Sequence, residues 1–193
     1  MIEDFVNEHS GIDILINNAV SSIKKPFLEI SEQDWEFEVG NALKGYLFSS
    51  QTAAKEMIKS NRPGRIVSIS SVHSFAAAKD NTVYGICKAG INRMTMNMAQ
   101  ELGQYNIICN AIAPGYIDSR ELPKDQEYMR AGEGYADNAK QYIPIGIGGV
   151  PDNIANMAVA LCTSVGNYVN GQTITIDGGL LTGFPVPDSE LGI

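Results

Sequence analysis

The chain has 193 residues, of which 44% are hydrophobic and 19% charged, and its net charge is −8. This length and composition suit one globular domain with a sizeable core. A negative balance without a basic cluster argues against nucleic acid or an anionic membrane surface as a partner. No apolar run approaches the roughly 20 residues that span a bilayer, and the N-terminus lacks a signal-peptide pattern. We therefore expect a cytoplasmic protein.

The three cysteines each sit in an apolar run of the sequence, at Cys87, Cys109 and Cys162. An odd number of cysteines in such surroundings is typical of reduced core thiols rather than of a disulfide framework. We assign no metal ligands.

The first third of the chain predicts a helix, a strand and a long helix. Met1–His9 has apolar residues at helical spacing. Ile12–Ile16 is a short apolar run, typical of a strand that is covered on both faces of a parallel sheet. In Ser31–Ser60 apolar and small residues recur at helical spacing. Ser31 and Asp34 resemble a capping box, which fixes the start of this helix.

The same alternation of strands and helices continues to the end of the chain. The expected elements are a strand at Arg65–Ser70, a helix at Thr82–Tyr105, a strand at Ile107–Ala113, a helix at Asp152–Thr163 and a strand at Gln172–Ile176. Strands joined through helices indicate βαβ units, hence a parallel sheet with right-handed crossovers. No repeat or linker divides the chain, so residues 1–193 are predicted to form one α/β domain.

Polar or glycine-rich residues follow each predicted strand. These segments are Asn17-Asn18-Ala19, Ser70-Ser71, Pro114–Ser119 and Asp177-Gly178-Gly179. In open parallel sheets, ligands bind outside the carboxyl ends of the strands. The sequence therefore predicts a binding site at this edge of the sheet.

The stretch Arg65–Lys88 brings groups suited to proton transfer to this edge. A strand ends at Ser70 and Ser71, and the first turn of the next helix carries Tyr84 and Lys88, four residues apart on one face. A cation about 4 Å from a phenol contributes roughly 4 kcal/mol at an effective dielectric of 20. Lys88 could therefore lower the phenol pKa, ordinarily near 10, by up to about three units.

Taken in order, the motifs resemble the short-chain dehydrogenase/reductase family. They are NNAV at Asn17–Val20, Asn41 in the long helix, ISS ending at Ser71, YGICK at Tyr84–Lys88, PGYIDS at Pro114–Ser119 and DGG at Asp177–Gly179. Each motif alone is weak, whereas their order along essentially the whole chain is specific. The resemblance implies a Rossmann-like, doubly wound parallel sheet in three layers, lacking the first strands of the nucleotide-binding half.

The resemblance also implies residue roles. Tyr84 would be the general acid/base, Lys88 would assist it and hold the nicotinamide ribose, Ser71 would polarise the substrate carbonyl, and Asn41 would position a proton-relay water. The cofactor would be NAD or NADP. The residues implied to bind it are Asn18, Ala19, Tyr84, Lys88, Pro114, Gly115, Ile117 and Ser119.

Two functions remain open at this point. The first is an oxidoreductase that interconverts a small ketone and a secondary alcohol of sugar, polyol or oxoacyl type. The second is a non-catalytic chain with a vestigial site and weak or no cofactor binding. The second is favoured by the lack of a G-x-x-x-G-x-G turn near the start, and by Val20 at a position where the family has glycine.

Simpler interpretations of the same residues are also open. Ser71 could cap a turn, Asn41 could be a polar packing residue, Tyr84 and Lys88 could lie on the surface, and His73 could be an exposed loop residue. Leu122–Ile143 could form a lid over the substrate or a plain surface excursion. The resemblance further implies a dimer or tetramer that pairs the Ser31–Ser60 and Thr82–Tyr105 helices across subunits.

Overall fold

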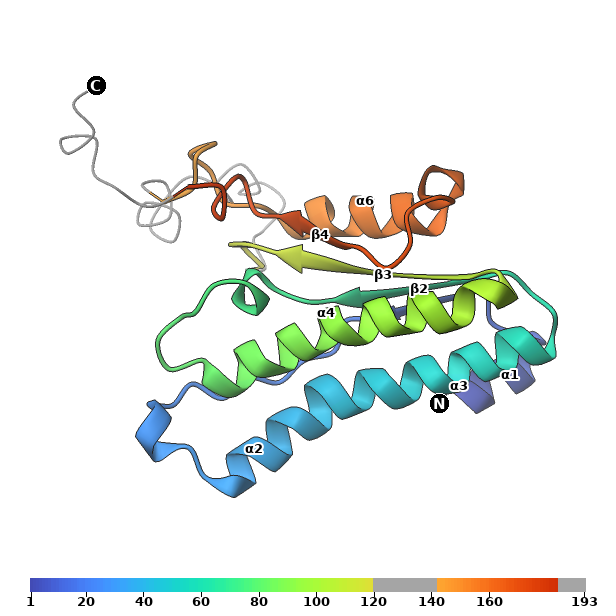
Figure 1. Cartoon of the computed structure of the whole chain (residues 1–193), viewed down its shortest axis with the longest axis horizontal. Helices are drawn as coiled ribbons and strands as arrows, with labels where there is room; N and C mark the ends of the chain where they lie inside the picture. The colour runs from blue at the N-terminus through green and yellow to red at the C-terminus, as the bar shows by residue number, and fades with distance from the viewer. Residues whose placement is uncertain (120–141, 184–193) are drawn as a thin grey trace, which may run out of the picture.

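The computed structural model describes residues 1–119 and 142–183. Its four strands form one sheet in the order β1-β2-β3-β4, and every neighbouring pair is parallel (Figure 1). The strands are β1 (Ile14–Asn17), β2 (Gly64–Ile69), β3 (Ile107–Pro114) and β4 (Thr173–Ile176). The predicted parallel sheet is therefore confirmed.

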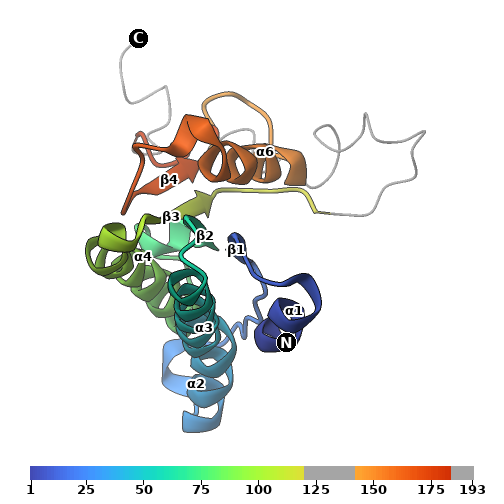
Figure 2. The same ribbon diagram turned by 90° about the vertical axis from the view of Figure 1, so that its right-hand side faces the viewer.

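Helices cover both faces of this sheet, which gives the predicted three layers (Figure 2). One face carries α1 (Ile2–His9), α3 (Gly45–Lys59) and α4 (Thr82–Leu102), and the other carries α6 (Pro151–Cys162). Alternate residues of each strand pack against the helices on opposite faces of the sheet, because successive side chains of a strand point to opposite faces. In β2, Ile66 packs with α3 and α4, whereas its neighbour Val67 packs with α6.

The position of α6 corrects the prediction that all crossovers share one hand. The strand order advances in the same direction from β1 to β4. The first two crossovers place α3 and α4 on one face of the sheet, but the third places α6 on the opposite face. A connection that moves to the next strand in the same direction, but passes over the opposite face of the sheet, has the opposite handedness. The β3–α6–β4 unit therefore departs from the rule that such crossovers are right-handed.

Strand β1 lies at the edge of the sheet and is less covered than predicted. Ile14 and Ile16 are 48% and 46% exposed, although their apolar run predicted burial on both faces. The helix on their side, α6, packs over β2 and β3. The expectation of a fully covered strand is therefore wrong for β1 in the described part of the chain.

The long helical segment is divided by a wider turn. Ser31 caps α2 (Glu32–Glu38) as predicted: its hydroxyl accepts a hydrogen bond from the Asp34 amide at 3.2 Å, and its own amide donates to the Asp34 carboxylate at 2.9 Å. A π-helical segment, Val39–Lys44, then separates α2 from α3. Short 3₁₀ turns occur at Phe27–Glu29, Val72–Ser74, Gly103–Tyr105 and Ser164–Gly166. In the described residues no helix is long and apolar enough to cross a membrane.

Candidate active site

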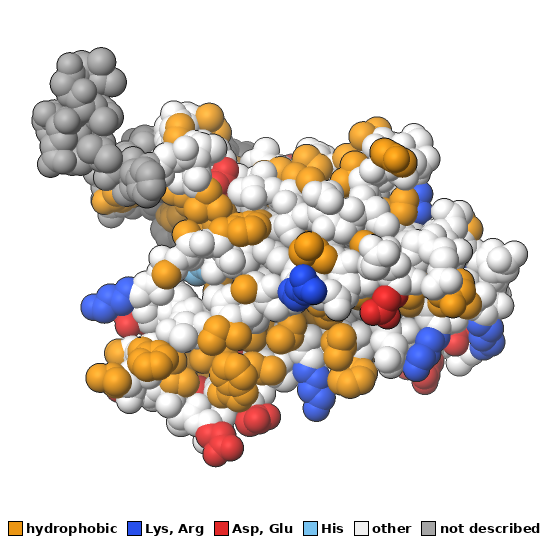
Figure 3. Space-filling model, in the orientation of Figure 1, with side chains coloured by type: hydrophobic (Ala, Val, Ile, Leu, Met, Phe, Trp, Pro, Cys, Tyr) orange, Lys and Arg blue, Asp and Glu red, His pale blue; other side chains and the backbone are white. Residues whose placement is uncertain are grey.

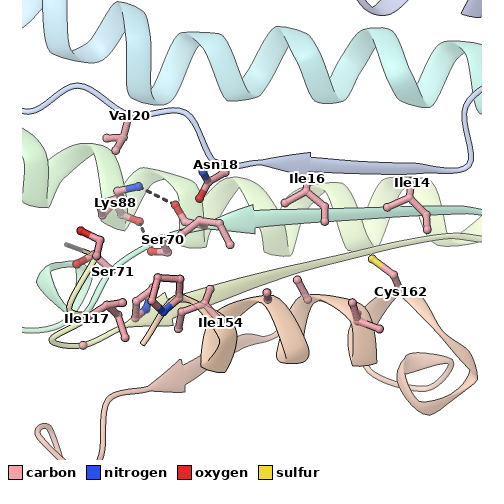
Figure 4. Close-up of a pocket in the computed structure, with 18 of the residues that line it drawn as sticks. Ile14, Ile16, Asn18, Val20, Ser70, Ser71, Lys88, Ile117, Ile154 and Cys162 are labelled. Carbon is pink, nitrogen blue, oxygen red and sulfur yellow. Dashed lines mark hydrogen bonds between the residues drawn. The ribbon is translucent and has the colours of Figure 1, made fainter. Parts of the chain in front are cut away.

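A cavity of about 1050 Å³ opens at the carboxyl ends of β1, β2 and β3. At one end it is bounded by Asn18, Ser70, Ser71 and Lys88, and it extends along the exposed side of β1 toward Cys162 (Figure 4). The predicted location of the site is thus where the structure has its large cavity. Apart from its polar end, the lining is mainly apolar.

Lys88 lies at the centre of the polar end and is 1% exposed. Its ammonium donates a hydrogen bond of 2.7 Å to the backbone carbonyl of Ile69, and it lies 5.4 Å from the centre of the Tyr84 ring. Burial lowers the pKa of Lys88 to about 8. Tyr84 and Lys88 therefore meet in the cavity and are not surface groups.

Tyr84 has a higher pKa than a free phenol, contrary to the expected effect of Lys88. Burial is the main cause of the rise in pKa, the neighbouring Ser71 hydroxyl acts against it, and the charge of Glu38 adds to it. The Lys88 ammonium faces the Tyr84 ring, and the cost of desolvating a phenolate outweighs its attraction. At neutral pH, Tyr84 is a protonated phenol.

Ser71 caps a turn and also lines the cavity. It lines the cavity beside Tyr84. Its hydroxyl also accepts a hydrogen bond of 3.2 Å from the His73 amide and so caps the short Val72–Ser74 turn. The cap fixes the hydroxyl oxygen at the cavity wall, where the Ser71 side chain also interacts with that of Tyr84.

Asn41 does not join this group. Its side chain is exposed and donates a hydrogen bond of 2.8 Å to the Phe37 carbonyl of its own helix. The neighbouring residue Ala42 is the buried one, and it packs against Val83 and Cys87 of α4. Among the described residues, no hydrogen bond joins the Asn41 side chain to Ser71, Tyr84 or Lys88.

Most residues expected to bind the cofactor line the cavity. Those that do are Asn18, Tyr84, Lys88, Pro114, Gly115, Ile117 and Ser119. Ala19 is exposed and does not line it, whereas Val20, 48% exposed, does. The residues present fit the nicotinamide and ribose half of a dinucleotide, because Lys88 supplies N–H donors there. On the side between β1 and α6, the lining is Ile14, Ile16, Ile154, Ala155, Ala158 and Val159, which offers no cation to a pyrophosphate.

The PGYIDS and DGG segments pack directly on one another. A side chain at Gly115 would come within 2.6 Å of the Asp177 Cβ, so only glycine fits there. Gly178 and Gly179 have positive φ angles, and the Asp177 carboxylate accepts a 2.9 Å hydrogen bond from the Gly179 amide. These glycines serve turn geometry, and through it they shape the cavity wall at Gly115.

Three buried polar residues of the site region, Asn17, Ser70 and Tyr46, were given no role from the sequence. Asn17 donates to the hydroxyls of Ser50 (2.9 Å) and Ser68 (3.2 Å), and its carbonyl oxygen accepts from Ser49 at 2.6 Å. The Ser70 hydroxyl donates to the Lys88 carbonyl at 3.1 Å. The Tyr46 ring lies 5.5 Å from the Lys88 ammonium. The spacing of four residues between Ala42 and Tyr46 could have indicated that Tyr46 is buried. Using it would have required knowing that Ala42 lies on the buried face of this helical segment.

His73 is half-buried and lies edge-on to the Tyr84 ring, with the ring centres 5.5 Å apart. The expectation of an exposed loop residue is therefore wrong.

Cys87, Cys109 and Cys162 are free thiols, as predicted, and burial raises the pKa of the first two to about 11 and about 12. The described residues hold no group of three or more His, Cys, Asp or Glu placed to bind a metal ion.

The region proposed as a lid, Leu122–Ile143, lies outside the described residues except for Tyr142 and Ile143. Tyr142 is exposed and Ile143 is buried.

Comparison with known proteins identifies the family. The parallel sheet with helices on both faces is Rossmann-like, as in the oxidoreductases that it resembles. A family model described as enoyl-(acyl carrier protein) reductase matches residues 1–181. The chain belongs to the short-chain dehydrogenase/reductase family.

Two relatives and one solved structure illustrate the similarity. The 3-oxoacyl-[acyl-carrier-protein] reductase of Aquifex aeolicus is 36% identical over 92% of this chain and 69% of its own length. The 2-dehydro-3-deoxy-D-gluconate 5-dehydrogenase of Escherichia coli is 36% identical over 94% of this chain and 70% of its own. A Burkholderia cenocepacia gluconate 5-dehydrogenase, solved with NADP and tartrate, is 28% identical with a TM-score of 0.83, over 95% of this chain and 70% of that one.

Proposed function

We propose that this chain is an NAD(P)-dependent oxidoreductase that interconverts a small ketone and a secondary alcohol of sugar, polyol or oxoacyl type. The observation that carries the proposal is the convergence of Ser71, Tyr84 and Lys88 at one end of the large cavity. Relatives named as sugar-acid dehydrogenases and oxoacyl reductases support the substrate class.

The proposed roles are those that the family resemblance implies, and the position of these residues at the cavity supports them. A bound nicotinamide supplies or accepts the hydride at the carbonyl carbon. Ser71 donates its hydroxyl proton in a hydrogen bond to the substrate oxygen, and Tyr84 transfers a proton to that oxygen. Because Tyr84 is a protonated phenol at neutral pH, it is prepared for ketone reduction. Lys88 holds the nicotinamide ribose through its N–H groups. Asn41 is left out of this set because its side chain is exposed and turned to its own helix.

The test combines cofactor titration with turnover. We expect NADH or NADPH to bind the purified chain and a panel of small sugar, polyol and oxoacyl ketones to be reduced. Tyr84→Phe should lower kcat by at least about 100-fold, since a positioned proton donor typically contributes that much. Tyr105→Phe, a change at a half-exposed ring outside the cavity, should leave kcat unchanged.

The second candidate is a chain whose site is vestigial and binds the cofactor weakly or not at all. It rests on the apolar lining between β1 and α6 and on Val20 at the cavity wall, and the similarity to oxidoreductases over most of the chain does not support it. Under this alternative, calorimetry would detect no binding of NADH or NADPH at micromolar concentrations. No ketone would then be reduced, and Tyr84→Phe would behave like the parent chain.

We also propose that the chain assembles with copies of itself through α3 and α4. Figure 3 shows hydrophobic side chains gathered over the helical face of the molecule. On these two helices Leu47, Phe48, Ile86 and Met96 are 45–52% exposed. Large exposed apolar groups that lie close together mark interaction surfaces more often than isolated ones do.

A further inference from the structure

Tyr46 occupies the buried face of the first turn of α3. It follows Glu38 and Ala42 at four-residue intervals, and all three side chains are buried. Tyr46 is 3% exposed, and the centre of its ring lies 5.5 Å from the Lys88 ammonium. The Tyr84 ring lies at nearly the same distance, 5.4 Å. Lys88 is thus in contact range of two tyrosine rings, one from α3 and one from its own helix.

The Lys88 ammonium has few other groups to stabilise its charge. In the described part of the chain its one hydrogen bond goes to the Ile69 carbonyl of β2, and no carboxylate forms an ion pair with it. The titratable groups around it are Tyr46 of α3 and Tyr84 and Cys87 of α4. A cation within about 6 Å of an aromatic ring centre is attracted by the ring, and more strongly where both are desolvated.

The ring of Tyr46, rather than its hydroxyl, makes this contact. The Tyr46 hydroxyl is buried and has no hydrogen-bond partner among the described residues. Burial raises the pKa of Tyr46 well above that of a free phenol, so it supplies no negative charge to Lys88 near neutral pH. The interaction available to Lys88 on this side is the one with the ring.

We propose that Tyr46 is a positioning residue for Lys88, whose ring holds the ammonium in place and in its charged form within the cavity. This role has catalytic meaning only if the proposed oxidoreductase function is correct. The contact itself belongs to the folded chain and can be measured without turnover.

The test is an NMR titration of the chain labelled with ¹³C at lysine Cε, with Lys88→Met assigning the Lys88 signal. Tyr46→Phe keeps the ring and removes the hydroxyl, whereas Tyr46→Leu removes the ring. Tyr105→Leu makes the same chemical change at a half-exposed tyrosine outside the cavity. We expect the pKa of Lys88 to fall by roughly 0.4 to 1.5 units in Tyr46→Leu, which corresponds to the loss of one cation–π contact. Tyr46→Phe and Tyr105→Leu should leave it unchanged.

An unchanged or higher Lys88 pKa in Tyr46→Leu would overturn the proposal, as would an equal fall in Tyr46→Phe. If ketone turnover is measurable, the limb of the pH–rate profile that reports Lys88 should move to lower pH in Tyr46→Leu alone. Failure of every ketone to react in the parent chain would count against the proposed function. The pKa comparison would still decide the role of Tyr46.

Discussion

The Ser70 hydroxyl donates a hydrogen bond of 3.1 Å to the backbone carbonyl of Lys88. In the reverse direction, the Lys88 ammonium donates to the Ile69 carbonyl at 2.7 Å. Two adjacent residues at the end of β2 therefore hold one residue of α4 by both its backbone and its side chain. This double link sets where Lys88 stands relative to the strand end that carries Ser71.

Removing one of these links should destabilise the fold modestly. Ser70 is 2% exposed, so Ser70→Ala loses a buried hydrogen bond. We expect the free energy of unfolding to fall by about 1 kcal/mol, measured by urea denaturation with an unchanged m-value. Ser60→Ala, at an exposed serine, serves as the control. Equal stability of the Ser70 and Ser60 variants would show that the link contributes nothing.

Replacing Lys88 should change how stability depends on pH. The pKa of Lys88 is about 8 in the fold and 10.5 as a reference value, so between these pH values the unfolded chain binds more protons. The charged Lys88 therefore lowers the free energy of unfolding at low pH. This destabilisation diminishes as the pH rises through about 8 to 10.5. The stability of Lys88→Met relative to the parent chain should fall by about 1 kcal/mol between pH 7 and pH 9.

The comparison of variant with parent removes the contribution of the cysteines, whose raised pKa values act in the opposite direction. Lys55→Met, at an exposed lysine, is the matched control. A pH-independent difference for Lys88→Met would contradict the lowered pKa.

Glu38 should destabilise the chain when it is ionised. It is fully buried, and burial raises its pKa despite the backbone amide of Ile23 and the Ser22 hydroxyl, which favour the carboxylate. A raised folded pKa means that the destabilisation is absent at low pH and complete above the folded pKa. We expect Glu38→Gln to raise the melting temperature more at pH 8 than at pH 4.

Glu36→Gln is the matched control, since Glu36 is exposed on the same helix. A gain for Glu38→Gln that is the same at both pH values, or larger at pH 4, would be inconsistent with a buried carboxyl of raised pKa.

A charge on the exposed apolar face of α3 should weaken self-association. Phe48 is 50% exposed, and in Phe48→Glu a carboxylate would have to be desolvated in any interface there. Light scattering coupled to size-exclusion chromatography should find the parent chain as a dimer or tetramer and the variant as a smaller species. Phe5→Glu on α1, at a similarly exposed ring, should not change the mass. A monomeric parent chain would refute the proposed assembly.

The strands in the middle of the sheet could be predicted almost to the residue. Ile107–Ala113 was expected and Ile107–Pro114 is observed, because a strand buried on both faces gives a continuous apolar run. The same pattern was misleading at β1, where Ile14 and Ile16 are exposed. A sequence shows which residues are apolar but not which neighbouring element covers them.

The exposure of Asn41 could not be predicted for a different reason. The helical pattern located the segment correctly, but the π-helical turn at Val39–Lys44 changes the angle between successive side chains. As a result Ala42 and Tyr46 face α4, and Asn41 faces solvent. By contrast, Tyr84 and Lys88 lie in a regular helix, where four-residue spacing was a reliable guide.

The three hydrogen bonds of Asn17 anchor one end of the edge strand β1 more firmly than the other. At the site end, Asn17 is held to α3 and to β2, next to Asn18 at the cavity. The distal end begins at Ile14, which is half-exposed, and β1 is paired with another strand on its β2 side alone in the described chain. In hydrogen exchange, opening of β1 should therefore begin at Ile14 and stop short of Asn17. Fraying of this edge would loosen the apolar side of the cavity at Ile14 and Ile16 and leave its polar end next to Asn17 in place.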